Sequence, residues 1–177
     1  ITGGGGSDVI DVGTGTNTVR FAATGDYGDT INNFDASGGS REDQIQFVDS
    51  LNTLFDDITN DNNIQFNGAN GAGNNSNQLV NLDTGLEGLF LDGSTDNGVS
   101  TANLTNAAAV AQEFNDEFDL TAADGETTLL VINDTSSGSN DTAIWQWTQS
   151  GGGEMSAGEL QLIALVHADA ALSTGNL

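Results

Sequence analysis

A nine-residue pattern near the start of the chain constrains its fold more than any other feature. Residues 3–11 (GGGGSDVID) fit G-G-x-G-x-D-x-U-x at every fixed position, where U is a large aliphatic residue. Residues 12–20 (VGTGTNTVR) keep two glycines and the aliphatic residue in register and place Asn17 where aspartate belongs. Such a short repeat predicts a parallel solenoid in which each unit is a turn followed by a brief strand.

The pattern weakens farther along the chain. Residues 21–29 keep only Asp26 in register. Residues 38–46 (GGSREDQIQ) match again, except that Arg41 replaces the third glycine. The sequence therefore predicts a short roll rather than a long one.

Each part of the unit has a physical role. The single aliphatic residue of each strand, which is Ile10, Val19 or Ile45, points inward and forms a narrow core. The glycines let backbone carbonyls turn toward a common point without strain. Two units form one coil, so residues 18 apart are expected to stack, and Asp8 is expected to lie over Asp26.

The charge balance makes a bound cation the expected partner of this repeat. The chain of 177 residues has 26 acidic and 2 basic side chains, a net charge of −24, and only 36% hydrophobic residues. Such a charge opposes compaction. Hard divalent cations prefer carboxylate and carbonyl oxygen, so we expect Asp8 and Asp26 to hold one Ca²⁺ ion, with carbonyls near Gly4 and Gly6 completing its shell.

The same composition excludes several classes of partner. Arg20 and Arg41 are the only basic residues, so phosphates of nucleic acids and anionic membrane surfaces are not expected ligands. No apolar run approaches the 18 residues of a membrane span, and no membrane insertion is expected. The chain has no cysteine, which removes disulfides and thiolate metal sites, and it opens without a basic or apolar leader.

Two strings after the repeat carry a family resemblance. Residues 29–34 (DTINNF) and 43–47 (DQIQF) are similar to the D-x-I-x-x-F and D-x-I-x-F exit from the calcium-binding β-roll of repeats-in-toxin (RTX) proteins. Residues 1–47 as a whole resemble the end of such a roll. The two strings begin with Asp29 and Asp43, which we add to the candidate ligands of the repeat. The predicted metal ligands are then Gly4, Gly6, Asp8, Asn17, Asp26, Asp29 and Asp43.

The resemblance also implies a location. It implies the C-terminal region of a bacterial protein secreted by a type I system, with an uncleaved export signal at the C-terminus. Residues 129–134, 141–144 and 159–163 resemble the terminal regions of such proteins more loosely. A roll of this family is disordered at low cytosolic calcium and folds outside the cell, at the cell surface or in solution, where weak calcium sites are occupied.

The expected fold is mostly β. Residues 1–47 are predicted to form the roll segment, which merges into a β-rich, sandwich-like body at 48–177. An alanine-rich stretch predicts a helix near 104–119. Residues 129–132, 143–148 and 160–166 are predicted strands, and a possible capping box at Ser156 and Glu159 suggests a short helical turn.

Several weaker candidate sites were found. Residues 57–64 loosely match the start of an EF-hand loop, and residues 92–96 are a weaker oxygen-rich loop. Asp134 and Asp141 flank a turn and are candidates to share an ion. His167 is the only histidine, so a transition-metal site is not expected, and a core or surface role is favoured.

These observations favour a structural function over catalysis. We expect a secreted, non-enzymatic, calcium-binding surface protein, such as an S-layer, filament, biofilm-matrix or adhesin component, that associates with itself or with a cell-surface or matrix polysaccharide. One alternative is the non-catalytic calcium-binding C-terminal module of a secreted hydrolase. Another is a carbohydrate-binding module that uses Trp145 and Trp147, although their alternation on one strand is more typical of a core.

Overall fold

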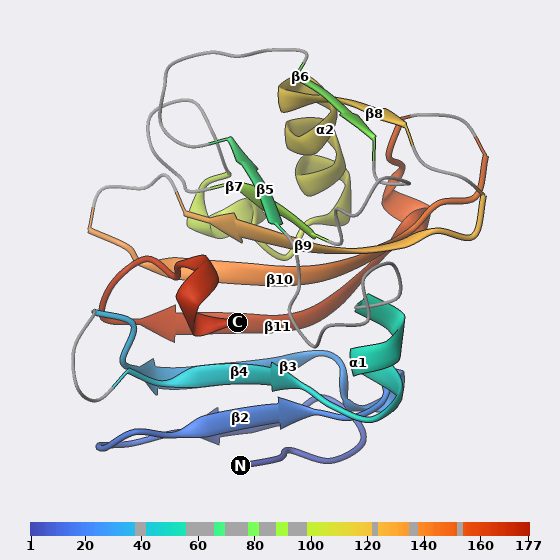
Figure 1. Cartoon of the computed structure of the whole chain (residues 1–177). Helices are drawn as coiled ribbons and strands as arrows, with labels where there is room; N and C mark the ends of the chain where they lie inside the picture. The colour runs from blue at the N-terminus through green and yellow to red at the C-terminus, as the bar shows by residue number, and fades with distance from the viewer. Residues whose placement is uncertain are drawn as a thin grey trace.

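A computed structural model shows that the chain is mostly β, as predicted (Figure 1). The two candidate loops at 57–64 and 92–96 lie outside the residues whose structure is described. The described residues are 1–37, 42–55, 66–69, 78–81, 88–91, 99–121, 124–134, 138–151 and 154–177.

One seven-stranded sheet forms the centre of the molecule, with the strand order β1-β3-β11-β10-β9-β7-β5. Strand β10 runs antiparallel to both of its neighbours, and all other adjacent strands are parallel. The seven strands are β1 (Val9–Asp11), β3 (Asp29–Phe34), β11 (Leu160–Ala168), β10 (Asp141–Thr148), β9 (Thr127–Asn133), β7 (Gly88–Leu91) and β5 (Phe66–Ala69).

The first four strands form the expected parallel roll. Strands β2 (Thr18–Phe21) and β4 (Gln44–Phe47) pair in a separate parallel sheet, so the chain alternates between the central sheet and this smaller one. Figure 1 shows these blue and cyan strands together at the N-terminal end of the molecule. Strand β3 also pairs with β11, so the roll and the body share one sheet.

The coils of the roll are longer than predicted. Residues that stack are 21 apart between β1 and β3 and 26 apart between β2 and β4, rather than 18 apart. A 3₁₀ turn at Thr24–Asp26 lengthens the first coil. As a result Asp29, not Asp26, lies opposite Asp8, which corrects the expected stacking of Asp8 on Asp26.

The inward-facing residues of the roll are confirmed. Ile10, Val19 and Ile45 are 6%, 0% and 1% exposed. The ladder pairs Ile10 with Ile31 and Val19 with Ile45, so each coil places one aliphatic side chain over the next. Val9, the neighbour of Ile10 on β1, is 75% exposed, as the two-residue alternation of a strand requires.

The other edge of the central sheet has a similar winding. Strands β6 (Gln78–Asn81) and β8 (Phe118–Thr121) pair in parallel in a third small sheet. From β5 to β9 the chain alternates between the central sheet and this one. The chain therefore winds between two sheets on each side of the β10–β11 pair.

The central sheet is covered on both faces. Along β9, Leu129 and Val131 belong to the core beneath the roll, whereas Leu130 and Ile132 belong to a second core beneath helix α2 and strand β8. All four side chains are fully buried. Burial on both faces explains why this strand is a continuous apolar run rather than an alternating one.

The predicted helix is shorter than expected. Helix α2 spans Ala107–Glu117, and the Asn106 side chain caps it by accepting hydrogen bonds from the N–H groups of Ala108 and Ala109. It ends at residue 117 because the next four residues form β8. No helix among the described residues is long and apolar enough to span a bilayer. The shorter helices are α1 (Ser50–Phe55) and 3₁₀ turns at Thr101–Asn103, Ala157–Glu159 and Thr174–Asn176.

Truncation of a buried side chain on β3 should lower the stability of the protein more than truncation of an exposed side chain on β1. Ile31 is fully buried, so Ile31→Ala should lower the free energy of unfolding by about 3 kcal/mol at a fixed calcium concentration. The control is Val9→Ala, which should change it by less than about 0.5 kcal/mol because Val9 is exposed. Urea denaturation followed by circular dichroism measures both, and equal losses would contradict this assignment of the core.

Candidate metal centre in the roll

The spaced glycines of the repeat adopt the backbone conformation that the pattern requires. Gly4 and Gly6 have φ angles of +88° and +99°, and Gly13 and Gly15, nine residues later, have φ angles of +70° and +110°. Residues with a Cβ atom rarely occupy this left-handed region. The first two nonapeptides therefore form equivalent turns, one before β1 and one before β2.

The first turn stacks on the turn that precedes β3. The Gly6 N–H donates to the Gly25 carbonyl over 2.8 Å, and the N–H of Asp8 donates to Oδ1 of Asp29 over 2.8 Å. Asp29 is only 1% exposed. This contact brings two of the predicted ligands together across neighbouring coils.

The carboxylates of Asp8 and Asp29 both lie against Gly3. A Cβ atom built on Gly3 would lie 2.7 Å from Oδ2 of Asp29 and 3.1 Å from Oδ2 of Asp8. A side chain at this position would therefore collide with the two carboxylates. Two carboxylate oxygens that approach one point, one of them from a buried residue, form an arrangement suited to a hard cation.

The electrostatics of the pair are unfavourable without a cation. Burial raises the pKa of Asp29, and the nearby charges of Asp8 and Asp26 raise it further, against the lowering effect of the Asp8 N–H. The contact of a carboxylate with the His167 ring lies elsewhere, at Asp141. A divalent ion between Asp8 and Asp29 would neutralise charges that no basic side chain offsets there.

Asp26 lies near Asp8 and Asp29 but is not the residue that lies opposite Asp8 in the strand pairing. Its Oδ2 accepts hydrogen bonds from the N–H groups of Ala22 and Ala23, over 2.9 and 3.2 Å, and so closes its own 3₁₀ turn. Its charge also contributes, after burial, to a raised pKa of Tyr27. Asp26 therefore stabilises the turn beside the carboxylate pair.

The second turn brings Asn17 and Asp43 together in a different way. Asp43 is fully buried. Its Oδ1 accepts from the backbone N–H and the side-chain amide of Asn17, over 2.7 and 3.1 Å, and its Oδ2 accepts from the Asp35 N–H over 2.9 Å. Three protein donors thus satisfy this carboxylate.

The donor set decides which metal fits the first turn. Across the described ranges, no group of three or more histidine, cysteine, aspartate or glutamate side chains is placed to hold a metal. The remaining ligands at Asp8 and Asp29 would have to be water and backbone carbonyls of the turn, which contains the predicted ligands Gly4 and Gly6. An all-oxygen shell with several carbonyls suits Ca²⁺ and not zinc or copper, which favour nitrogen or sulfur.

Each member of the other predicted carboxylate pair contacts a residue outside the pair. Asp134 accepts a hydrogen bond from the Thr101 hydroxyl, whereas Oδ1 of Asp141 lies 2.7 Å from Nδ1 of His167. The two side chains therefore have different partners, although their backbones are paired. The His167 side chain is 40% exposed, which places it on the surface.

The two tryptophans belong to the core. Trp145 and Trp147 are 3% and 0% exposed, and both pack beneath helix α2. The indole N–H of Trp145 donates to the Leu104 carbonyl, and that of Trp147 donates to Glu159. Buried rings cannot stack on a sugar, so these two tryptophans do not support a carbohydrate-binding module.

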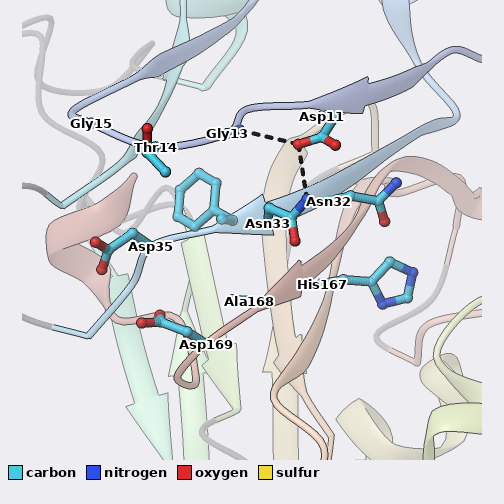
Figure 2. Close-up of a pocket in the computed structure, with 11 residues that line it drawn as sticks. Asp11, Gly13, Thr14, Gly15, Asn32, Asn33, Asp35, His167, Ala168 and Asp169 are labelled. Atoms are coloured by element: carbon cyan, nitrogen blue, oxygen red, sulfur yellow. Dashed lines mark hydrogen bonds between the residues drawn. The ribbon is translucent and has the colours of Figure 1, made fainter.

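A groove of about 760 Å³ lies at the carboxyl ends of β1, β3 and β11 (Figure 2). Because these strands are adjacent and parallel, Asp11, Asp35 and Asp169 at or just after their ends meet along this edge. Sequence reasoning missed this grouping. The available signal was an aspartate at the end of each strand, but the pairing of β3 with β11 could not be read from the sequence.

The carboxylates of this groove accept hydrogen bonds from nearby turns. Figure 2 shows Asp11 between the Gly13 N–H and the Asn33 side-chain amide, at 3.1 and 2.9 Å. Oδ1 of Asp169 accepts from the Ala36 N–H over 2.8 Å. These aspartates therefore have structural partners within the fold.

Comparisons of this chain with protein-family models, with curated proteins and with solved structures found no match.

The buried charge of Asp29 should make stability depend on pH in calcium-free buffer. Because its folded-state pKa is raised, its contribution is fully present below the unfolded pKa of about 4 and is lost as pH rises through the folded value. Asp29→Asn removes this titration, so the variant should gain stability relative to the native chain between pH 4 and 7. Urea denaturation measures the difference.

The control for this experiment is Asp119→Asn, which makes the same change in net charge at an exposed position. It should show no comparable trend with pH. A stability difference between Asp29→Asn and the native chain that is constant from pH 4 to 7 would contradict the assignment.

Proposed function

We propose that this chain is a secreted calcium-binding structural or surface protein, in which a Ca²⁺ ion between Asp8 and Asp29 stabilises the first coil of a β-roll. The observation that carries this proposal is the approach of two carboxylate oxygens to one point beside Gly3, at a ladder position where Asp29 is buried. Backbone carbonyls of this turn, in which Gly4 and Gly6 have left-handed φ angles, would supply further oxygen ligands.

The calcium affinity expected of such a site supports a location outside the cell. A shell built from two carboxylates and neutral carbonyls has low charge and binds calcium weakly, in the range typical of extracellular modules. Weak sites of this kind are occupied at millimolar calcium and empty at cytosolic levels. Calcium would therefore complete the fold after export and would also reduce the net charge of −24.

A structural role is supported by the hydrogen bonds that the carboxylate of Glu159 accepts within the fold. Glu159 accepts hydrogen bonds from Ser150, Ser156 and Trp147, which, against the effect of burial, lower its pKa to about 2. This glutamate fixes the turn that joins β10 to β11, where the predicted capping box with Ser156 is present. We assign the protein a non-catalytic role at the cell surface or in an extracellular matrix.

The partners that fit this role are other copies of the chain or an extracellular polysaccharide. A strongly acidic surface repels its own copies at low salt, and calcium ions that bridge carboxylates reverse that repulsion. Electron microscopy with and without calcium tests self-association, with ordered polymers expected only when calcium is present. Nucleic acid is not among the proposed partners because the chain has two basic residues.

Calcium binding can be tested with a pair of neighbouring glycines. Gly3→Ala would place a methyl group against both carboxylates, so it should weaken calcium affinity at least about tenfold, which is about 1.4 kcal/mol. Gly5→Ala is the control, because a Cβ atom there would lie 3.7 Å from the Gly25 carbonyl, an ordinary contact. Isothermal titration calorimetry gives affinities, and far-UV circular dichroism follows calcium-induced folding.

Two results would overturn the proposal. One is a native chain that binds no calcium and has the same circular dichroism spectrum in EGTA as in millimolar calcium. The other is equal calcium affinity for the native chain, Gly3→Ala and Gly5→Ala, which would place any bound ion away from Asp8 and Asp29.

A further inference from the structure

We infer that Asn17 determines where calcium binds on the roll. In the second turn its side-chain amide bonds the buried carboxylate, as the ion does in the first turn. The second turn is therefore closed without calcium, and the first turn alone depends on it. This inference rests on the proposed calcium-binding function and specifies its location.

The two turns are equivalent in backbone structure. Asp8 lies opposite Asp29 in the ladder, as Asn17 lies opposite Asp43. In each case the backbone N–H of the first residue donates to Oδ1 of the second, over 2.8 Å and 2.7 Å respectively. Since the frames coincide, the difference between the turns lies in their side chains.

The two buried carboxylates receive different numbers of donors. Asp43 receives three N–H donors, one of them the Asn17 amide at 3.1 Å. Asp29, among the residues that the structure describes, receives one N–H donor, and its second oxygen lies near Gly3 together with an oxygen of the charged Asp8 side chain. A buried carboxylate requires hydrogen-bonding or charged partners. The chain therefore supplies fewer partners at the first turn and places a second negative charge there.

The residues beside the two turns also differ. The Asp8 and Asp29 oxygens lie against Gly3, which has no side chain. The residue nine positions later in the repeat is Val12, whose side chain is 6% exposed and belongs to the core of the roll. The turns therefore differ at this position as well as in the residue that faces the buried aspartate.

The end of the chain contacts the start of β4, the strand that pairs with β2. The Asn176 amide, which is 1% exposed, donates to the Asp43 carbonyl over 3.2 Å, and the Gln44 amide donates to the Gly175 carbonyl over 3.0 Å. Protein groups therefore hold Asp43 on its backbone side as well as at its carboxylate, whereas Gly13 and Thr14 of the second turn are exposed at the groove.

The first experiment asks which turn holds the ion of the native roll. The number of bound Ca²⁺ ions per chain is measured by calorimetry and equilibrium dialysis for Asp29→Asn and for the matched variant Asp43→Asn. Asp29→Asn should bind one ion fewer than the native chain, whereas Asp43→Asn should bind the same number. Both variants make the same chemical change at equivalent positions, so a general effect of charge would alter both.

The second experiment exchanges the chemistry of the two turns. Asp8→Asn copies the second turn into the first and should remove one bound ion while making folding of the first coil less dependent on calcium. Asn17→Asp copies the first turn into the second and, alone or combined with Val12→Gly, should add one ion per chain. Asp119→Asn and Asn103→Asp, both at exposed positions, control for the changes in net charge.

The outcomes separate this inference from the proposed function. If the native chain binds no calcium, both are overturned. If it binds calcium, but Asp43→Asn loses an ion and Asp29→Asn does not, the calcium-binding function stands and the role of Asn17 is overturned. If Asn17→Asp fails to fold, the Asp29→Asn and Asp43→Asn pair still decides the question.

Discussion

The hydrogen bond from a backbone N–H to a carboxylate one coil away is the contact on which the roll depends. It occurs twice, from Asp8 to Asp29 and from Asn17 to Asp43, and it fixes the register of each parallel pair. It also creates a problem, because a short carboxylate side chain at a ladder position becomes buried with its charge. Three N–H donors, one of them the Asn17 amide, stabilise the charge of Asp43, whereas at Asp29 and Asp8 we propose that a Ca²⁺ ion does so.

The consequences reach beyond the roll because its strands continue the central sheet. Strand β3 pairs with β1 on one side and with β11 on the other. Through β11 it meets β10, whose buried tryptophans pack beneath helix α2. A change in the first coil thus acts on the edge of a sheet that extends through the molecule, and the body is not an independent neighbour of the roll (Figure 1).

The sequence was most informative where short-range chemistry fixes the structure. The left-handed glycines and the inward positions of Ile10 and Val19 follow from the nine-residue pattern, and the Asn-capped helix follows from an alanine-rich run. The coil length did not follow, because the 3₁₀ turn at Thr24–Asp26 adds residues that the pattern does not record. The expected partner of Asp8 was therefore wrong. The groove at the ends of β1, β3 and β11 was missed for a related reason: it depends on pairing between segments more than 130 residues apart in sequence.

The carboxylate pair lies at an edge of the central sheet. Strand β1 is at the end of the strand order, and within the described ranges it pairs with β3 alone, over three residues. Edge elements with few contacts open at lower free energy than the core they border. Asn17, which precedes β2 in the same coil, bonds the carboxylate of Asp43 with its amide instead. The ion that we propose at Asp8 and Asp29 would therefore act at an exposed edge of the sheet, on the pairing of β1 with β3. In the proposed function, an edge whose order depends on calcium would make the contacts of the acidic protein conditional on that cation.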